Sequence, residues 1–358
     1  MRIVIYQDYL RVGGTESQSL YLAKRLLDMG HEVTVLTNRP GGRLRSQAFE
    51  SGLAVKNLQA FDFHLNWFAP DLVRQLQNLR PEIVLLMGRN ANGTGSLLQR
   101  KLRNTLVVST VRTGRPFTRA YQKSLKSAPL ICCNSVFAAR RLEQLGIARN
   151  RIAVHPNPCL RASDIDALAP RHTRPRSANG HLIYVAAFVP GKNHASLIRL
   201  MPILLTRFKG LTLTLVGEGP LQGRMQKLVR SLGLDANIVF AGYRRDIPEL
   251  LAQADLAISP SLEESLPNAL VEAQYAGLPV VAFEVAGVGE CLLHGQSGLL
   301  VPPGDMQEFG KAVSSVLMDE ASWRSMAESA HRFAHLTFEP NLRFDAFIEC
   351  VMKYRTAS

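Results

Sequence analysis

The chain has 358 residues, 46% of them hydrophobic, so it can bury a sizeable core and is long for one domain. Its five cysteines, an odd number without zinc-ligand spacing, exclude a disulfide framework and a cysteine-based zinc site. No apolar stretch reaches the roughly 18 residues of a membrane span, and the run 3–6 is too short for a signal peptide. We therefore expect a cytoplasmic protein.

The net charge of +13 is unevenly distributed. Residues 1–165 hold 24 Lys and Arg against 10 Asp and Glu, whereas residues 166–358 hold 18 against 19. This asymmetry predicts that the first half meets an anionic partner: nucleic acid, a membrane surface or an acidic acceptor. No RNP, zinc-finger or helix-turn-helix signature accompanies the charge, so we expect no nucleic-acid binding.

The first half alternates short apolar runs with helical patterns, which predicts an α/β fold with a doubly wound, mostly parallel sheet. The apolar runs are 3–6, 33–36, 83–86, 106–108, 130–133 and 152–154. After the first run, Gly13 and Gly14 precede Thr15 and Gln18, whose spacing predicts a capping box and a helix ending near Gly30. Two glycines there let the backbone approach a ligand closely, although a plain turn has the same pattern.

Residues 115–126 predict a helix with two unlike faces. One face is basic and the other is aromatic and apolar. The basic face holds Arg115, Arg119, Lys123 and Lys126, and the other holds Phe117, Tyr121 and Leu125. Such a helix fits an anionic membrane surface. The alternative is an apolar stripe facing the core, with solvated charges opposite.

The second half is expected to form another domain. Residues 166–180 are polar and proline-rich, which predicts a linker between domains 1–165 and 181–339. Strands are expected at 181–187, 211–216, 238–240 and 256–258. The sequence Asp164-Ile-Asp166 matches a DxD metal motif, but it does not end an apolar strand, so we interpret it as coincidence.

The stretch from Asp255 to Asp305 is the most informative. The strand 256–258 leads into a predicted helix 267–276, with Pro267 in its first turn and Gly277 as its C-cap. Glu264 lies at the junction, and Glu272 lies a turn and a half inside the helix.

On one continuous helix these two carboxylates would be about 12 Å apart, too far to share one proton transfer. We interpret them as two clamps on one long ligand, with a phosphate favoured between them by the helix N–H groups. This predicts a sugar joined by phosphates to a second sugar. The alternative is an ordinary amphipathic helix with solvated glutamates.

Glycine- and proline-containing segments follow at 277–283, 287–290 and 295–305. With them, the chain resembles glycosyltransferase family 4 over nearly its whole length. The resemblance implies the GT-B architecture, in which two Rossmann-like domains face each other and a final helix, 340–358, crosses back onto the first. It also implies a retaining, metal-independent enzyme without a cofactor, which moves a hexose-type sugar from a nucleotide diphosphate sugar, with UDP-sugar favoured, to an acceptor hydroxyl.

The same resemblance assigns roles to individual residues. Lys192 would bind the donor diphosphate, which Gly13 and Gly14 also face, while Glu264 would hold the transferred sugar and Glu272 the ribose. Gly217 and Tyr243 would lie near the base, although Tyr243 fits a partly buried structural tyrosine equally well. The junction residues expected to line the donor are Ser265, Leu266, Asn268, Ala269 and Leu270.

Three positions depart from the family pattern. Arg112 stands where many members have a histidine, and Ala186-Ala187 stand where they tend to have a Gly-Arg pair. Pro267 removes an amide that some relatives offer to the sugar. We expect Arg112 to replace the missing charge and to act in catalysis with Glu264 and Lys192.

The basic first domain is expected to take the acceptor, a lipid-linked glycan or a phosphorylated lipopolysaccharide core. The protein would then work peripherally on the inner face of a bacterial plasma membrane. Two other functions remain open. A nucleotide-sugar epimerase or hydrolase of GT-B fold would form product without an acceptor, and a catalytically weakened subunit would bind nucleotide sugar without turnover.

Overall fold

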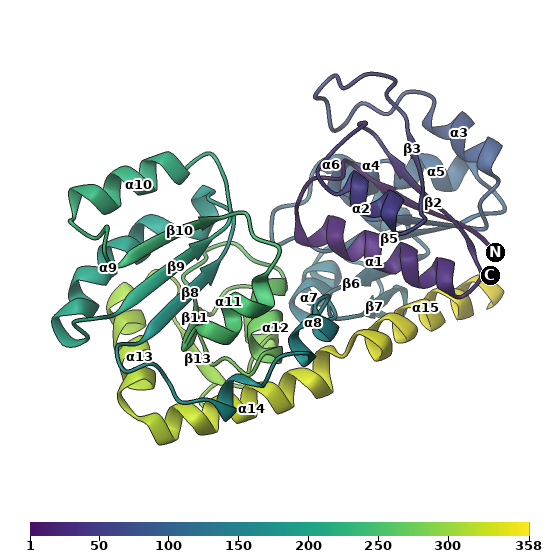
Figure 1. Cartoon of the computed structure of the whole chain (residues 1–358). Coiled ribbons are helices and arrows are strands. Elements are labelled where there is room, and N and C mark those ends of the chain that lie inside the picture. Colours follow the sequence, from purple (N-terminus) through teal and green to yellow (C-terminus); the bar gives the residue numbers. More distant parts are fainter. Residues whose placement is uncertain (358) are drawn as a thin grey trace. The chain divides into compact units, whose positions relative to one another are not determined.

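The computed structural model describes residues 1–357 and divides into two compact units (Figure 1). Unit 1 comprises Met1–Leu160 together with the residues from Asn341 onward, and unit 2 comprises Arg161–Pro340. Each unit has one parallel sheet with helices on both faces, so the predicted doubly wound α/β class is confirmed. Within residues 1–357, no helix combines the length and the apolar character that a membrane span requires.

The sheet of unit 1 has the strand order β3-β2-β1-β4-β5-β6-β7. The strands are β1 (Arg2–Gln7), β2 (Glu32–Thr37), β3 (Ala54–Asn57), β4 (Ile83–Leu86), β5 (Leu106–Val111), β6 (Leu130–Cys133) and β7 (Ile152–Val154). Strands β4, β5 and β6 are buried along their whole length, as continuous apolar runs predict for a sheet covered on both faces. The connections reverse direction between β1 and β4, which makes this pair the topological switch point.

Helices of unit 1 cover both faces of its sheet. They are α1 (Gly14–Asp28), α2 (Arg45–Glu50), α3 (Leu72–Leu79), α4 (Arg89–Gly93), α5 (Gly95–Lys101), α6 (Arg119–Ser127) and α7 (Val136–Gln144). One core joins α1 to the sheet and to α15 (Pro340–Ala357). A second core packs α3, α4 and α5 on the sheet.

The C-terminal helix α15 belongs to unit 1, although it follows unit 2 in the chain. Its Phe344 ring stacks on Tyr21 of α1 with centroids 5.5 Å apart, and Asp345 forms an ion pair with Arg25 at 2.9 Å. Phe347 and Val351 are buried in the same core. The apolar face of this helix therefore completes unit 1.

The sheet of unit 2 has the order β10-β9-β8-β11-β12-β13. Its strands are β8 (His181–Val185), β9 (Thr212–Val216), β10 (Ile238–Gly242), β11 (Leu256–Ser259), β12 (Val280–Phe283) and β13 (Gly298–Val301). Its helices are α8 (Ala162–Asp166), α9 (His194–Arg207), α10 (Gln222–Ser231), α11 (Ile247–Gln253), α12 (Asn268–Tyr275), α13 (Met306–Met318) and α14 (Glu320–Phe338). One core packs α9, α10 and α13 on the sheet. The switch point of this sheet lies between β8 and β11.

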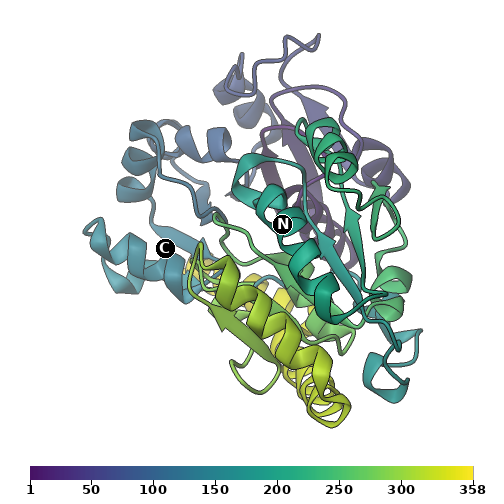
Figure 2. The same cartoon turned by 90° about the vertical axis from the view of Figure 1, so that its left-hand side faces the viewer.

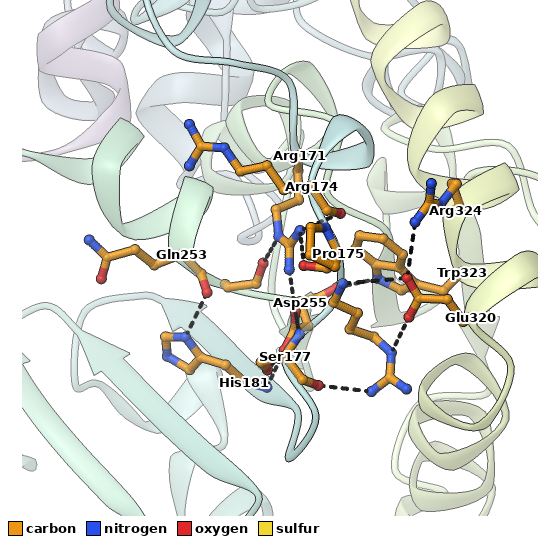
Figure 3. Close-up of polar contacts among 12 residues, drawn as sticks. Arg171, Arg174, Pro175, Ser177, His181, Gln253, Asp255, Glu320, Trp323 and Arg324 are labelled. Carbon is orange, nitrogen blue, oxygen red and sulfur yellow. Dashed lines mark hydrogen bonds and ion pairs between the residues drawn. The ribbon is translucent and has the colours of Figure 1, made fainter.

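The predicted linker 166–180 differs from the observed division of the chain. Unit 1 ends at Leu160 rather than at residue 165, and residues 166–180 belong to unit 2. Its Arg171 side chain is only 4% exposed and forms an ion pair with Asp255 (Figure 3). Local composition indicated a linker because prolines and polar residues are common in both linkers and anchored segments.

Two helix starts also differ from expectation. Helix α1 begins at Gly14 with no side-chain cap, and Gln18 donates to the Pro158 carbonyl instead, so the capping box is wrong. Helix α6 begins only at Arg119, because the Thr118 hydroxyl caps it by accepting from the Tyr121 N–H. Arg115 therefore precedes this helix.

The apolar side of α6 faces the core of unit 1. Tyr121 and Leu125 are buried there, while Phe117 is half-buried and packs against Tyr121. The membrane-facing interpretation of this aromatic face is wrong, and the core-facing alternative holds. All four predicted basic side chains remain exposed.

Candidate functional site

The switch point of unit 2 brings together the loops that follow β8 and β11. Lys192 ends the short 3-10 helix Pro190–Lys192 after β8, and Glu264 follows β11. Their side chains form an ion pair of 2.5 Å between Lys192 Nζ and Glu264 Oε1, and both are largely buried. The two residues expected to share one ligand are thus neighbours, because parallel strands deliver their following loops to one edge of the sheet.

Hydrogen bonds fix these two loops to each other. The Tyr184 hydroxyl donates to the Lys192 carbonyl at 2.8 Å and also contacts Ser261 Oγ at 2.8 Å. The Leu262 N–H donates to the Gly191 carbonyl. Burial strongly raises the pKa of Tyr184, so its hydroxyl stays protonated and can donate. These hydrogen bonds therefore fix the backbone of the two loops that hold the ion pair.

Helix α12 starts at Asn268, four residues after Glu264. Pro267 is its N-cap, so the helix begins one residue later than predicted, and the Pro267 carbonyl accepts from the Leu270 N–H at 3.1 Å. Leu266 and Leu270 are buried, so their side chains pack in the core. Ser265, Asn268 and Ala269 are half-buried. This helix start presents backbone N–H groups beside the Lys192–Glu264 pair.

Glu272 lies in the interior of α12 and is buried. Arg161 Nη1 donates to both of its carboxylate oxygens, at 3.0 and 3.1 Å. Burial raises the pKa of Glu272, and Arg161 opposes part of that rise. The alternative of a solvated glutamate is wrong for this residue. Sequence reasoning missed Arg161; a buried carboxylate requires a cation, but no local signal indicates which one.

Glycines shape the neighbouring loops of unit 2. Gly217 has a φ of +136°, and its N–H donates to the Gly242 carbonyl at 2.8 Å. A Cβ at Gly217 would lie 2.2 Å from the Ala186 carbonyl oxygen, so only glycine fits. Tyr243 follows Gly242 and is half-buried. The two residues predicted near the base thus lie in adjacent loops, after β9 and β10.

In unit 1, the Gly13-Gly14 turn lies after β1 at the switch point. A carboxylate from its own helix, Glu16, packs against it, and a Cβ at Gly13 would lie 2.4 Å from Glu16 Oε2. Arg11 pairs with Glu16 at 2.8 Å. Burial raises the pKa of Glu16. Sequence reasoning missed this carboxylate, which lies at the turn that the resemblance assigns to phosphates.

Arg112 follows β5 at the same edge of the unit 1 sheet. Its Nη1 donates to Asn157 Oδ1 at 2.6 Å. Burial lowers the pKa of Arg112 to about 10, and the groups that oppose this shift are Cys132, Cys133 and Tyr121 rather than a carboxylate. The guanidinium remains charged at neutral pH. Arg112 is half-buried and donates to an amide oxygen, so its positive charge is suited to an anionic ligand.

No group of three or more His, Cys, Asp or Glu side chains within residues 1–357 has the geometry of a metal site. Asp166 of the DxD sequence ends α8 and lies 3.6 Å from His335 Nε2.

Two family models match the chain, one in each unit. Residues 12–159 match Glycosyltransferase Family 4, and residues 179–319 match Glycosyl transferases group 1. The lipopolysaccharide core biosynthesis glycosyltransferase LpsE of Rhizobium meliloti is 25% identical over 341 residues, which is 94% of this chain and 95% of that protein.

The exopolysaccharide phosphotransferase SCO2592 of Streptomyces coelicolor is 35% identical over 193 residues, which is 53% of this chain but only 19% of that protein. Among solved structures, HepE of Anabaena in complex with UDP-glucose has a TM-score of 0.81 at 22% identity, covering 99% of this chain and 100% of that one. This structural similarity shows the fold.

Proposed function

Because the chain belongs to glycosyltransferase family 4 and has the GT-B fold, we propose that it transfers a hexose-type sugar from a nucleotide diphosphate sugar, with a UDP-sugar favoured, to an acceptor hydroxyl. The observation that carries the proposal is the Lys192–Glu264 pair at the switch point of unit 2. Open α/β sheets bind their ligands at this point. Here it offers a cation for a diphosphate and a carboxylate for a sugar hydroxyl.

The proposed transfer retains the anomeric configuration. The leaving diphosphate takes the proton from the incoming hydroxyl on the same face of the sugar, so the protein's main task is to stabilise the charge that develops on the diphosphate. Lys192 and the N–H groups at the start of α12 supply this stabilisation. We propose that no metal ion takes part and that Lys192 and these N–H groups act in its place.

The remaining donor contacts are proposed separately for residues of each unit. Glu272 is proposed to accept hydrogen bonds from the ribose, held in place by Arg161, and the loops of Gly217 and Tyr243 to contact the base. Gly13 and Gly14 are proposed to approach the diphosphate from unit 1. Arg112 is proposed to add the second cation, since its guanidinium remains charged at neutral pH.

The acceptor is proposed to be a lipid-linked glycan or a phosphorylated lipopolysaccharide. The name of the Rhizobium meliloti relative and the positive charge of unit 1 support this choice. Arg115, Arg119, Lys123 and Lys126 are proposed to meet its anionic groups or an anionic membrane surface. This would place the protein peripherally on the cytoplasmic face of the plasma membrane.

The first test is a thermal-shift screen against UDP-, GDP-, ADP- and CMP-sugars without metal. A ligand that binds only the native state raises the unfolding midpoint with its occupancy. One class of donor should stand out, and its shift should be lost in Glu272→Ala. No shift with any donor would contradict the proposal.

The second test is turnover by the Glu264→Gln variant. We expect kcat to fall by about 100-fold or more, the range found when one polar group that stabilises a transition state is removed. Glu263→Gln is the matched control, because Glu263 is the exposed neighbour and should leave turnover unchanged.

Omitting the acceptor distinguishes the other functions. Sugar product formed without it would indicate an epimerase or hydrolase. Donor binding without turnover would indicate a weakened binding subunit. The departures from the family pattern at Arg112 and Ala187 favour this alternative.

A further inference from the structure

An irregular segment of unit 1 exposes a cluster of large apolar side chains. This aromatic loop, residues 58–71, connects β3 to α3 and extends from one end of the sheet (Figures 1 and 2). Phe61, Phe63, Leu65 and Trp67 are between 39 and 76% exposed, all within seven residues. Isolated exposed apolar residues are normal, but a contiguous group of this size indicates an interaction site.

Polar side chains hold the aromatic loop in one conformation. Arg39 donates hydrogen bonds to both carboxylate oxygens of Asp62, at 2.7 and 2.8 Å, and to Asn66 Oδ1 at 2.9 Å. Gln59 Nε2 donates to the carbonyls of Leu65 and Phe68 at 2.8 and 2.7 Å. The Arg39 guanidinium lowers the pKa of Asp62 to about 2, so this pair persists at physiological pH. The hydrogen bonds of Arg39 and Gln59 therefore hold the loop in a conformation in which its apolar side chains are exposed.

The chemistry of the aromatic loop favours hydrocarbon over sugar as its partner. Its tips are three aromatic rings and a leucine, and its polar groups at Gln59, Asp62 and Asn66 bond within the loop and to Arg39. A glycan site needs polar groups directed at hydroxyls as well as rings to stack on. Here these three polar side chains bond within the loop or to Arg39, while the exposed His64 lies among the apolar tips. Trp and Phe side chains of this kind prefer the boundary between lipid headgroups and acyl chains.

The charge near the aromatic loop indicates what kind of membrane surface it would meet. The aromatic loop follows β3 and the segment holding Arg115 and Arg119 follows β5, so parallel pairing places both at the carboxyl edge of the unit 1 sheet. Both arginines are exposed. Apolar tips and exposed cations at one edge complement an anionic bilayer. The buried aromatic face of α6 cannot supply the apolar contact, whereas the aromatic loop can.

We propose that the aromatic loop inserts Phe61, Phe63, Leu65 and Trp67 into the headgroup region of an anionic phospholipid bilayer and so docks the protein on the membrane. This inference rests on the proposed function in one respect, namely that a lipid-linked acceptor would lie in the membrane. Nucleotide-sugar binding by unit 2 does not depend on it.

Fluorescence tests the insertion directly. The chain has two tryptophans, of which Trp67 is exposed and Trp323 is fully buried. Vesicles of phosphatidylglycerol and phosphatidylethanolamine with brominated acyl chains should shift the emission to shorter wavelength and quench it. Trp67→Phe should abolish both changes while the protein still binds vesicles, since phenylalanine keeps the apolar contact. Unchanged emission of vesicle-bound wild-type protein would overturn the proposal.

Vesicle flotation tests the contribution of the loop. Phe61→Ser with Phe63→Ser should lower the vesicle partition coefficient by about 100-fold, at about tenfold for each apolar side chain that no longer enters the bilayer. Ile203→Ser, at an exposed apolar position of unit 2, is the matched control and should leave partitioning unchanged.

The double variant should keep the wild-type thermal shift with donor sugar, which separates failure of this inference from failure of the proposed function. Equal partitioning of the double variant and the wild type would overturn the proposal. So would a Trp67 emission change that depends on protein concentration without vesicles, because it would assign the aromatic loop to contacts between copies of the chain.

Discussion

At the scale of single residues, burying the Glu272 carboxylate in unit 2 has a desolvation cost that its partner Arg161 offsets. Glu272 is a buried carboxylate whose pKa is raised by desolvation, and Arg161 is the cation that offsets this cost. A carboxyl group with a raised pKa stabilises the folded state most when it is protonated, and this contribution is lost as the pH rises through its folded pKa. The Arg161 contact therefore matters more at higher pH.

This argument predicts a pH-dependent effect of Arg161→Ala. Near pH 8 the variant should be destabilised by about 1–3 kcal/mol, because an ionised Glu272 is left buried without its partner. The loss should shrink as the pH falls and Glu272 becomes protonated. Thermal denaturation between pH 5 and 8 measures it. In a Glu272→Gln background, the effect of Arg161→Ala should no longer depend on pH; a dependence that persisted would contradict the assignment.

Backbone geometry at Gly217 predicts a second residue-scale effect. Gly217→Ala forces a side chain into a left-handed conformation and against the Ala186 carbonyl, so unit 2 should lose about 2 kcal/mol or more. A Cβ at Gly223 in α10 would meet no atom within 4 Å, and the φ of this residue is not positive. Gly223→Ala should therefore stabilise the protein by about 0.5–1 kcal/mol. Chemical denaturation of both variants compares them, and equal effects would contradict the argument.

At the scale of secondary-structure elements, one buried acidic residue ties four segments of unit 2 together. Asp255, directly before β11, accepts hydrogen bonds from the N–H groups of Ser177 and His181 at 3.0 and 2.7 Å (Figure 3). Arg171 forms an ion pair with it and lies over the Trp323 ring of α14. The Trp323 indole donates to the Asp255 carbonyl. This cluster anchors the segment that composition alone identified as a linker.

Removing the centre of this cluster should destabilise unit 2 strongly. Asp255→Ala leaves the buried Arg171 guanidinium unpaired, which typically costs about 3–5 kcal/mol. Trp323 fluorescence during denaturation reports the loss. Asp246→Asn is the matched control, because Asp246 pairs with Arg244 in an exposed position where such pairs contribute little to stability. A small effect of Asp255→Ala would show that the segment is held by its other contacts.

At the scale of the whole molecule, the chain leaves unit 1, forms unit 2 and returns to unit 1 through α15. The stability of unit 1 thus depends on residues at the far end of the sequence. Four apolar side chains of α15 are buried in its core: Phe344, Phe347, Ile348 and Val351.

A chain ending at Pro340 should therefore lose unit 1 selectively. Each of the four side chains contributes about 1.5–3 kcal/mol when fully buried, which together approaches the whole stability of a typical domain. Calorimetry should show that the unfolding transition of unit 1 is lost while that of unit 2 remains. As point-variant controls, Phe347→Ala should destabilise unit 1, and Leu342→Ala, at an exposed position, should not. Equal stability of the truncated and full chains would contradict this.

Local patterns were sufficient for much of the fold. Continuous apolar runs predicted most strands, because a parallel strand covered on both faces needs apolar residues on each. The strands β3, β12 and β13 were not predicted. The strand β3 is an exposed edge of four residues without such a run, and β12 and β13 lie in segments that were noted only for their glycines and prolines. The family resemblance assigned Lys192 and Glu264 to one ligand, and parallel topology delivers the two loops that hold them to one edge of the sheet.

By itself, the sequence determined the α/β class, most strands, the family resemblance and the candidate donor residues. The tertiary structure decided what depends on distant partners: that Glu272 pairs with Arg161, that Glu16 packs into the Gly13-Gly14 turn, and that residues 166–180 are anchored. It also turned the aromatic face of α6 inward and left the aromatic loop exposed. The physical reason is that burial and ion pairing are set by residues far apart in the chain, whereas an amphipathic pattern is the same whether its apolar face meets a core or a membrane.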